Sequence, residues 1–344
     1  MPFAGIRTDR LLLREVRNSD ADDLVRRRND AEVSEYQDWT TPYPRASADE
    51  VIAETIALGG PTPDEWYMLT VANADDTTVH GDVVVHLSAD GHTAEIGYTL
   101  ARESWGHGYA SDAVAALVEY LFESLGVTRV EGRLHPANTA SAMVLERAGM
   151  LFEGHTRLSY WLEDENSDDW IYGLIRSDWL AWRDRPRHRP EAIRLVEITP
   201  ETIHRVAELQ THRTQRRFVS PVLNSFGDAL FPEVVGGAPL VPWMRAIDAD
   251  GDLVGFVMVA RTTPAHPEPY LWRLLVDRMH QRRGIGNATL ALVVAQCRAW
   301  GDRSLLTSWV PGRGSPAPVY LAAGFVPTGN VIDGEIEGRL TFAS

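Results

Sequence analysis

The sequence predicts an α+β protein with two domains of similar design, each a mixed sheet flanked by helices. Its 344 residues are enough for two domains of ordinary size. Short apolar strands alternate with helical patterns in the same order in both halves. Between the halves lies a charged segment without apolar periodicity, Arg183-Asp184-Arg185-Pro186-Arg187-His188-Arg189-Pro190. We therefore expect domains at residues 1–184 and 191–344, joined by a linker at 185–190.

The first half begins with an expected strand at 11–16 and a helix at 20–29, which Ser19 or Asp20 is able to cap. The next expected elements are two strands, 66–72 and 81–87, joined by a polar turn. After them we expect a strand (94–100), a helix (110–125), a strand (129–134), a helix (139–148) and a closing hairpin (152–162 and 170–174).

The second half follows the same plan. It begins with a strand at 193–198 and a helix at 200–212, with Thr199 as N-cap and Pro200 at the first helical position. Asp250-Gly251 predicts a tight hairpin turn between two strands. The expected elements are those strands (244–249 and 253–260), a strand (270–276), a helix (287–300), a strand (305–310), a helix (317–323), two closing strands, and proline-rich loops (232–242 and 264–269).

The composition argues against several classes of partner. A net charge of −15 disfavours nucleic acid and anionic membrane surfaces. No apolar run approaches the roughly 20 residues that span a bilayer. Charged residues from Arg7 onward interrupt the N-terminus before any signal-like core. We expect a cytoplasmic protein with neither a nucleic-acid nor a membrane partner.

Cysteine, histidine and lysine usage narrows the chemistry. Cys297 is the one cysteine, so no internal disulfide forms, and its apolar surroundings favour an inert buried thiol. No histidine pair has metal-ligand spacing, and no metal is expected. All 33 basic residues are arginine. That bias fits either a GC-rich genome or selection against self-acylation at lysine.

Two glycine-rich turns stand between a strand and a helix. They are Gly106-His107-Gly108 and the six residues Gln281 to Gly286. Such a turn presents free backbone N–H groups and a helix N-terminus to an anion such as phosphate. Gly106 and Gly284 lie 178 residues apart, and an Ala-Gly pair follows each turn, which indicates duplicated architecture. Neither turn is a nucleotide P-loop, which needs a lysine, nor a dinucleotide fingerprint, which needs three glycines.

The order strand, Gln-x-x-Gly-x-Gly, helix, then a tyrosine before Ala-Gly-Phe, resembles the GCN5-related N-acetyltransferase (GNAT) superfamily. The resemblance implies two GNAT-like domains with mostly antiparallel twisted sheets. It also implies acetyl-CoA as co-substrate, its pyrophosphate at the glycine turn, and transfer of an acetyl group to a primary amine.

The second half, over residues 194–342, resembles bacterial diamine and spermine/spermidine acetyltransferases. By that resemblance Tyr320 is the general acid to the departing CoA thiolate; the alternative is that Tyr320 only packs on the sheet. Arg313 stands where relatives often carry asparagine, which leaves the acceptor open. The implied cofactor residues are Leu274, Leu275 and Val276 for the pantetheine arm, and Gln281, Arg282, Arg283, Gly284, Ile285 and Gly286 for the pyrophosphate.

The first half contains Glu95-Ile96-Gly97-Tyr98, Trp105-Gly106-His107-Gly108-Tyr109-Ala110, His135-Pro136-Ala137-Asn138-Thr139-Ala140-Ser141 and Val144-Leu145-Glu146-Arg147-Ala148-Gly149-Met150. With these segments it resembles, over residues 8–182, the RimJ/RimL-like branch of ribosomal-protein N-terminal acetyltransferases. Ser141 is the implied proton donor to CoA sulfur, and Glu95 the implied base; the alternatives are a helix-turn hydroxyl and a solvated strand carboxylate. Glu103 is placed where the family pattern has Gln or Arg at the start of the turn. The implied cofactor residues are Tyr98, Gly106, His107, Gly108, Tyr109, Ala110 and Asn138.

Three functional hypotheses remain open. Both halves act on small amines, such as an amino acid, a polyamine or an amino-sugar antibiotic; a protein N-terminus is a further acceptor. Alternatively, one half is catalytic and the other is a degenerate structural half. In the third hypothesis the protein is a non-catalytic acyl-CoA sensor. The complete turn at Gln281 favours the second half as the cofactor site, in a monomer with pseudo-dimeric halves or a homodimer.

Overall fold

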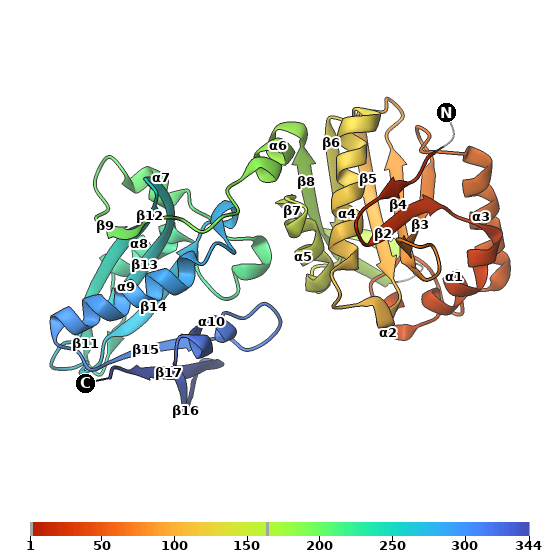
Figure 1. Cartoon of the computed structure of the whole chain (residues 1–344). Coiled ribbons are helices and arrows are strands. Elements are labelled where there is room, and N and C mark those ends of the chain that lie inside the picture. Colours follow the sequence, from red (N-terminus) through yellow and green to blue (C-terminus); the bar gives the residue numbers. More distant parts are fainter. Residues whose placement is uncertain (1–2, 163–164, 344) are drawn as a thin grey trace. The chain divides into compact units, whose positions relative to one another are not determined.

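The computed structural model describes residues 3–162 and 165–343. The chain divides into two compact units, Met1–Asp184 and Arg185–Ser344, called here the N-terminal and C-terminal units. Each contains one large mixed sheet flanked by helices, which confirms the α+β prediction (Figure 1). Among the described residues no helix is both long and apolar enough to cross a membrane.

The N-terminal unit is built on an eight-stranded sheet in the order β1-β2-β3-β4-β5-β6-β8-β7. Its strands are β1 (Ile6–Arg7), β2 (Leu11–Glu15), β3 (Trp66–Asn73), β4 (Val79–Leu87), β5 (Thr93–Leu100), β6 (Arg129–Leu134), β7 (Leu151–Leu162) and β8 (Glu165–Ile175). Its helices are α1 (Ala21–Arg28), α2 (Ala31–Ser34), α3 (Arg45–Leu58), α4 (Tyr109–Tyr120), α5 (Thr139–Arg147) and α6 (Arg176–Asp184), with 3₁₀ turns η1 (Asn18–Asp20) and η2 (Arg102–Ser104) and the π-helical turn η3 (Leu121–Leu125).

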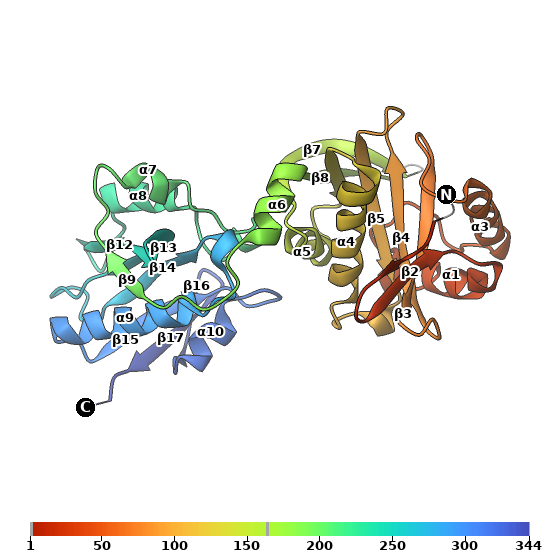
Figure 2. The ribbon, with the colours of Figure 1, turned by 45° about the horizontal axis from the view of Figure 1, so that its top comes forward.

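Helices cover both faces of this sheet. Figure 2 shows α4 on one side and α1 and α3 on the other. Leu117 and Val118 of α4 join Leu145 of α5 in the larger apolar core. Leu24 of α1 and Ile52 of α3 join a smaller core on the other face. Strands β2 and β3 are therefore buried on both sides, as their nearly continuous apolar sequences require.

The C-terminal unit has a seven-stranded sheet in the order β16-β17-β15-β14-β13-β12-β9, besides a small two-stranded ladder, β10 with β11. The strands are β9 (Ile193–Val196), β10 (Val234–Val235), β11 (Ala238–Pro239), β12 (Pro242–Ala249), β13 (Asp252–Ala260), β14 (Tyr270–Val276), β15 (Ser304–Trp309), β16 (Val326–Ile332) and β17 (Glu335–Thr341). The helices are α7 (Ile203–Ala207), α8 (Val222–Leu230), α9 (Ile285–Trp300) and α10 (Ala317–Ala322), with 3₁₀ turns η4 (Arg213–Gln215) and η5 (Arg278–His280).

The C-terminal sheet also carries helices on both faces, with α7 and α8 opposite α9 in Figure 2. Leu290 and Val293 of α9 pack with Trp309 and Phe325 in one core. Cys297 is fully buried there, and burial raises the pKa of its thiol to about 12. The opposite face packs against α7 and α8 through a second apolar cluster.

Two local predictions were wrong, and a third holds only in part. The helix expected at 200–212 is only α7, which begins at Ile203; Thr199 and Pro200 lie in a turn where the Thr202 hydroxyl accepts the Thr199 N–H at 2.9 Å. The expected loop at 232–242 contains the β10–β11 ladder. Asp20 is the N-cap residue of α1, one of the two predicted alternatives, but its side chain makes no cap hydrogen bond to α1 and accepts the Arg17 N–H before η1. The α2, α3, α6 and α8 helices were not predicted.

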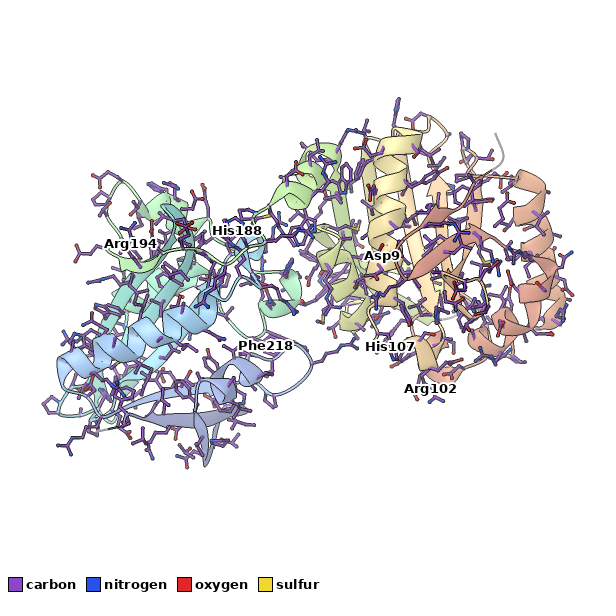
Figure 3. All side chains as sticks on the ribbon, in the orientation of Figure 1. Asp9, Arg102, His107, His188, Arg194 and Phe218 are labelled. Atoms are coloured by element: carbon purple, nitrogen blue, oxygen red, sulfur yellow. The ribbon has the colours of Figure 1, made fainter. Side chains whose placement is uncertain are left out.

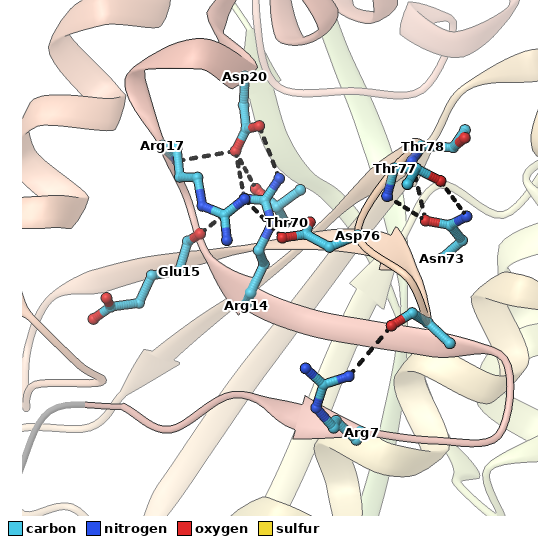
Figure 4. Close-up of polar contacts among 11 residues, drawn as sticks. Arg7, Arg14, Glu15, Arg17, Asp20, Thr70, Asn73, Asp76, Thr77 and Thr78 are labelled. Atoms are coloured by element: carbon cyan, nitrogen blue, oxygen red, sulfur yellow. Dashed lines mark hydrogen bonds and ion pairs between the residues drawn. The ribbon is translucent and has the colours of Figure 1, made fainter.

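Asp20 instead anchors a buried polar cluster (Figure 4). Its carboxylate accepts three hydrogen bonds: from the Arg14 guanidinium at 2.8 Å, from the Thr70 hydroxyl at 2.9 Å and from the Arg17 backbone N–H at 2.9 Å. Arg14 reaches on to Asp76 at 2.6 Å. Burial opposes ionisation of Asp20, but these hydrogen bonds outweigh it and hold the pKa of its carboxyl below the ordinary value. The cluster ties strand β2 to the start of α1.

We predict that Asp20→Asn lowers the free energy of unfolding by about 3 kcal/mol at pH 7, because Arg14 loses its buried partner. A depressed carboxyl pKa contributes stability above the unfolded-state pKa of about 4, and this is lost as pH falls through the folded-state value. The difference between wild type and variant in urea titrations should therefore shrink below that pH. The control Asp22→Asn removes a carboxylate that is 90% exposed and should leave stability unchanged. Equal losses in both variants would contradict a stabilising role for the cluster.

Candidate functional site

In each unit two neighbouring parallel strands pair over only a short stretch, which ends well before the first of the two strands does. In the N-terminal unit Thr93–Glu95 of β5 pairs with Arg129–Glu131 of β6. In the C-terminal unit Tyr270 and Leu271 of β14 pair with Leu306 and Thr307 of β15. Within the described chain no ladder joins either pair beyond these residues, whereas β5 and β14 stay paired with β4 and β13 to their ends. One edge of β5 and of β14 is thus left open.

Each open strand leads into its glycine turn, and the two turns share one backbone conformation. Gly106 and Gly108 have φ of 80° and 82°, and Arg282 and Gly284 have φ of 65° and 77°. Gly108 and Gly284 are the N-caps of α4 and α9, and neither helix has a side-chain cap. The first N–H groups of both helices therefore point out of the turn without a capping acceptor, which suits an anion.

The shared conformation corrects the register between the two turns. Gly284 corresponds to Gly108, not to Gly106, and the spacing is 176 residues. Trp105 then corresponds to Gln281, so the expectation that Glu103 begins the turn pattern was wrong. Glu103 lies in η2, before the turn, and pairs with Arg26 at 2.7 Å.

Trp105 and Gln281 perform the same task with different side chains. The indole N–H of Trp105 donates to the Leu100 carbonyl at 2.9 Å. The amide N–H of Gln281 donates to the Val276 carbonyl at 3.0 Å. Leu100 and Val276 are the last residues of β5 and β14. Each bond ties the start of the turn to the end of the open strand. The equivalence of Trp105 and Gln281 could be recognised only after the structure had given the register between the two turns.

Arginine side chains hold both turns in place. In the N-terminal unit Arg10 donates to the His107 carbonyl at 2.9 Å and pairs with Asp112; His107 is labelled with Arg102 in Figure 3. In the C-terminal unit Arg283 is only 6% exposed, and it donates to the His188 carbonyl at 2.8 Å. The neighbouring Arg282 is exposed. Of the two predicted phosphate-binding arginines, only Arg282 has a side chain directed to solvent.

Tyr320 lies beside the point where β14 and β15 separate. Its ring is 8% exposed and packs on Trp309 and Phe325, with ring centroids 5.8 and 5.6 Å away. Its hydroxyl bonds to Thr307, the last β15 residue paired with β14. Burial raises the pKa of Tyr320 to about 12, so the phenol keeps its proton at neutral pH. Tyr320 thus packs on the sheet, with its hydroxyl beside the split.

The corresponding region of the N-terminal unit uses other residues. The Tyr98 hydroxyl donates to the Ser141 carbonyl and lies 2.8 Å from the Ser141 hydroxyl oxygen. Burial raises the pKa of Tyr98 well above its ordinary value. The Asn138 side-chain oxygen caps α5 by accepting the Ser141 N–H at 3.0 Å.

Glu95 occupies the last paired position of β5 before the split. Its side chain is 31% exposed and lies 3.9 Å from the Arg133 guanidinium. Burial is the main cause that raises the pKa of Glu95, helped by Glu131 and opposed by Arg133. A carboxylate with a raised pKa is a stronger base than a solvated one.

Comparison with known proteins identifies the family to which the chain belongs. The family model described as an acetyltransferase (GNAT) domain matches residues 10–151, and the acetyltransferase (GNAT) family model matches residues 207–325. The chain belongs to the GNAT acetyltransferase family. The prediction of tandem GNAT domains is thereby confirmed, and the protein is an acetyltransferase.

Curated relatives and solved structures match half of the chain at a time. The uncharacterized N-acetyltransferase p20 of Bacillus licheniformis is 30% identical over 175 residues, 51% of this chain and 97% of the relative. The uncharacterized N-acetyltransferase YoaA of Bacillus subtilis is 27% identical over 51% of this chain and 98% of its own. A GNAT-family acetyltransferase structure from Bacillus anthracis is 23% identical, with a TM-score of 0.46, and covers 50% of this chain and 99% of that one.

The two GNAT units differ at the tyrosine position. The Met150 N–H bonds to the Leu145 carbonyl, and the Phe325 N–H bonds to the Tyr320 carbonyl, both at 3.1 Å. Leu145 therefore stands where the C-terminal unit has Tyr320. Ser141, which contacts Tyr98, lies one helical turn before Leu145 on α5.

We predict that Arg283→Met loosens the C-terminal turn, because the His188 carbonyl loses its donor. An unpaired buried group costs about 1–3 kcal/mol, which corresponds to roughly tenfold or more in local opening. Hydrogen–deuterium exchange of the amides at 281–286 should speed up accordingly. Arg282→Met is the matched control and should leave exchange unchanged. Faster exchange in the control alone would show that the two side chains have the opposite roles.

Proposed function

We propose that this GNAT protein is an acetyl-CoA-dependent N-acetyltransferase for the primary amine of a small molecule, with the C-terminal unit as a competent catalytic unit. One observation carries the proposal. The open edge of β14 runs from an uncapped turn at Gly284 to the protonated hydroxyl of Tyr320. The uncapped turn and the phenol lie at opposite ends of the open strand edge, which supports a phosphate site at one end and a proton donor at the other.

The cofactor residues follow from this arrangement. The pyrophosphate would accept the backbone N–H groups of the turn from Arg282 to Gly286, with the exposed Arg282 guanidinium as a mobile counter-charge. The backbone of Leu274, Leu275 and Val276 would pair with the pantetheine arm along the open strand edge. In the N-terminal unit the same parts are the turn from Gly106 through His107 and Gly108 to Tyr109 and Ala110, the strand at Tyr98, and the amide of Asn138.

The reaction needs three contributions from the protein: stabilisation of the oxyanion, protonation of the thiolate and deprotonation of the amine. A neutral amine attacks the thioester carbonyl, and backbone N–H groups on the open strand stabilise the oxyanion. The thiolate leaves with a proton from Tyr320 in the C-terminal unit, or from the Ser141–Tyr98 pair in the N-terminal unit. Glu95 removes the amine proton in the N-terminal unit. The net charge of −15 favours a cationic acceptor over an anionic one.

A second proposal is that only the C-terminal unit turns over. Leu145 at the position of Tyr320 leaves helix α5 of the N-terminal unit without a phenol, and this favours a single active unit. Thiol release that depends on an added amine separates both proposals from a non-catalytic acyl-CoA sensor.

We predict that Gly284→Glu abolishes acetyl-CoA binding in the C-terminal unit, because a carboxylate would stand beside the phosphates on a left-handed backbone. Titration calorimetry should detect one class of acetyl-CoA binding site fewer in this variant than in the wild type. Gly301→Glu is a matched control, because Gly301 has φ of 92° and open space around it at the other end of the same helix. It should keep wild-type affinity. An unchanged number of sites in Gly284→Glu would refute the phosphate assignment.

We predict that Tyr320→Phe lowers kcat for amine-dependent thiol release by about 100-fold or more while acetyl-CoA affinity stays the same. The phenyl ring preserves the packing on Trp309 and Phe325 and removes only the proton. Thiol-release assays over a panel of primary amines give kcat, and calorimetry gives the affinity. A variant with wild-type kcat would leave Tyr320 with a packing role alone.

A further inference from the structure

A three-residue hydrogen-bonded chain crosses the C-terminal sheet next to the split. The Tyr270 hydroxyl oxygen on β14 lies 2.6 Å from the Ser308 hydroxyl oxygen on β15. The Ser308 hydroxyl donates to the carboxylate of Glu335 on β17. Because Ser308 has a single proton and gives it to Glu335, Tyr270 must donate to Ser308. The lone pairs of the Tyr270 oxygen are therefore the acceptor at the free end of the chain.

The chain lies on the other side of the sheet from Tyr320. Consecutive residues of a strand point to opposite faces, so Thr307 and Ser308 are separated by the sheet. Thr307 bonds to Tyr320 on the face covered by α9 and α10, and Ser308 bonds to Tyr270 on the face covered by α7 and α8. Tyr270 is also the first β14 residue paired with β15. Two protonated phenols thus flank the point of separation from opposite faces.

Tyr270 occupies the position that Glu95 holds in the N-terminal unit. Glu95 pairs with His86 on β4 and Glu131 on β6. Tyr270 pairs with Ala260 on β13 and Leu306 on β15, the corresponding residues of the corresponding strands. The correspondence holds because β14 carries one extra residue, Trp272, at a bulge. At this position the N-terminal unit has the carboxylate of Glu95. The C-terminal unit has the phenol of Tyr270, which is linked to the Glu335 carboxylate through Ser308.

The charges around Tyr270 favour a cation. Glu335 and Glu337 on β17 face it, and Arg273 on β14 is the nearby positive group. Arg273 is paired with Asp228 of α8 at 3.3 Å, which offsets its charge. Burial raises the pKa of Tyr270, so its phenol stays protonated at neutral pH and passes a proton along rather than acting as a tyrosinate.

We propose that Tyr270, Ser308 and Glu335 form the proton path that converts the acceptor ammonium into the attacking amine. The proposal rests on the acetyltransferase function proposed above. The ammonium N–H bond breaks and its proton joins the Tyr270 oxygen, the Tyr270 proton passes to Ser308, and the Ser308 proton passes to Glu335. Glu335 then returns it to water. Tyr270 is the residue that touches the substrate, and Ser308 and Glu335 act through it.

The rest of the reaction balances on the other face. The nitrogen lone pair forms the C–N bond and the C–S bond breaks with its electrons on sulfur. Tyr320 gives the thiolate a proton and recovers one from water. The second proton passes from the nitrogen to water as the amide forms, and it balances the proton that Tyr320 took from water. Acid and base thus work from opposite faces of one sheet without sharing a residue.

The test uses the full chain with Gly108→Glu, which blocks the N-terminal turn, and measures amine-dependent thiol release against pH. In that background Tyr270→Phe, Ser308→Ala and Glu335→Gln should each lower kcat by about 100-fold at pH 7. The loss should shrink as pH approaches about 10, near the pKa of an alkyl amine, because water then supplies the neutral amine. Acetyl-CoA affinity measured by calorimetry should be unchanged, and Ser308→Thr, which keeps the hydroxyl, should restore the rate.

Ser304→Ala is the matched control. Ser304 is on the same strand and face and donates to Glu268 at 2.5 Å, but it lies before the paired residues at the split. Its removal should change kcat less than twofold. Equal rates in Tyr270→Phe and Ser304→Ala would refute the relay and leave the acetyltransferase function intact. If the Gly108→Glu protein binds acetyl-CoA but releases no thiol with any amine, the proposed function of the C-terminal unit fails, and the relay fails with it.

Discussion

The separation of two parallel strands is the constraint on which the rest of each unit depends. Parallel strands that paired along their whole length would satisfy every backbone group and leave nothing to offer a ligand. Here β14 and β15 pair at Tyr270 and Leu271 and then part, so the end of β14 keeps one free edge. Two hydrogen bonds stabilise the ends of the open edge. Tyr320 bonds to Thr307 where the strands separate, and Gln281 bonds to the Val276 carbonyl at the end of β14. We propose that the pantetheine arm of acetyl-CoA takes the place of the missing strand.

Much of this design could be read from the sequence, because it rests on local patterns. The strand at 270–276 was predicted to the residue, and so was the strand at 129–134. Both glycine turns and the tandem organisation followed from apolar periodicity and from glycines before helices. The placement of Tyr320 after the turn also came from the pattern. Such features can be predicted because each needs a particular residue type at a particular backbone position.

Other features depend on tertiary geometry that no local pattern encodes. The register between the turns was misjudged because Arg282, not glycine, takes the left-handed position that Gly106 occupies in the first turn. Trp105 was overlooked because an indole replaces an amide in the same hydrogen bond. The Tyr270 chain was invisible because β14, β15 and β17 are adjacent only in the folded sheet. The roles given to Glu95, Ser141 and the turn residues remain predictions.

The two units present one scaffold with two chemical solutions, a direct carboxylate at Glu95 and a relayed one behind Tyr270. Both solutions require that acetyl-CoA lie along the open strand with its sulfur at the split. A crystal structure of the full chain soaked with acetyl-CoA measures this most directly. The account predicts pyrophosphate against the 282–286 amides and the thioester sulfur within about 3.5 Å of the Tyr320 hydroxyl. Cofactor bound away from the β14 edge, or sulfur far from Tyr320, would contradict it.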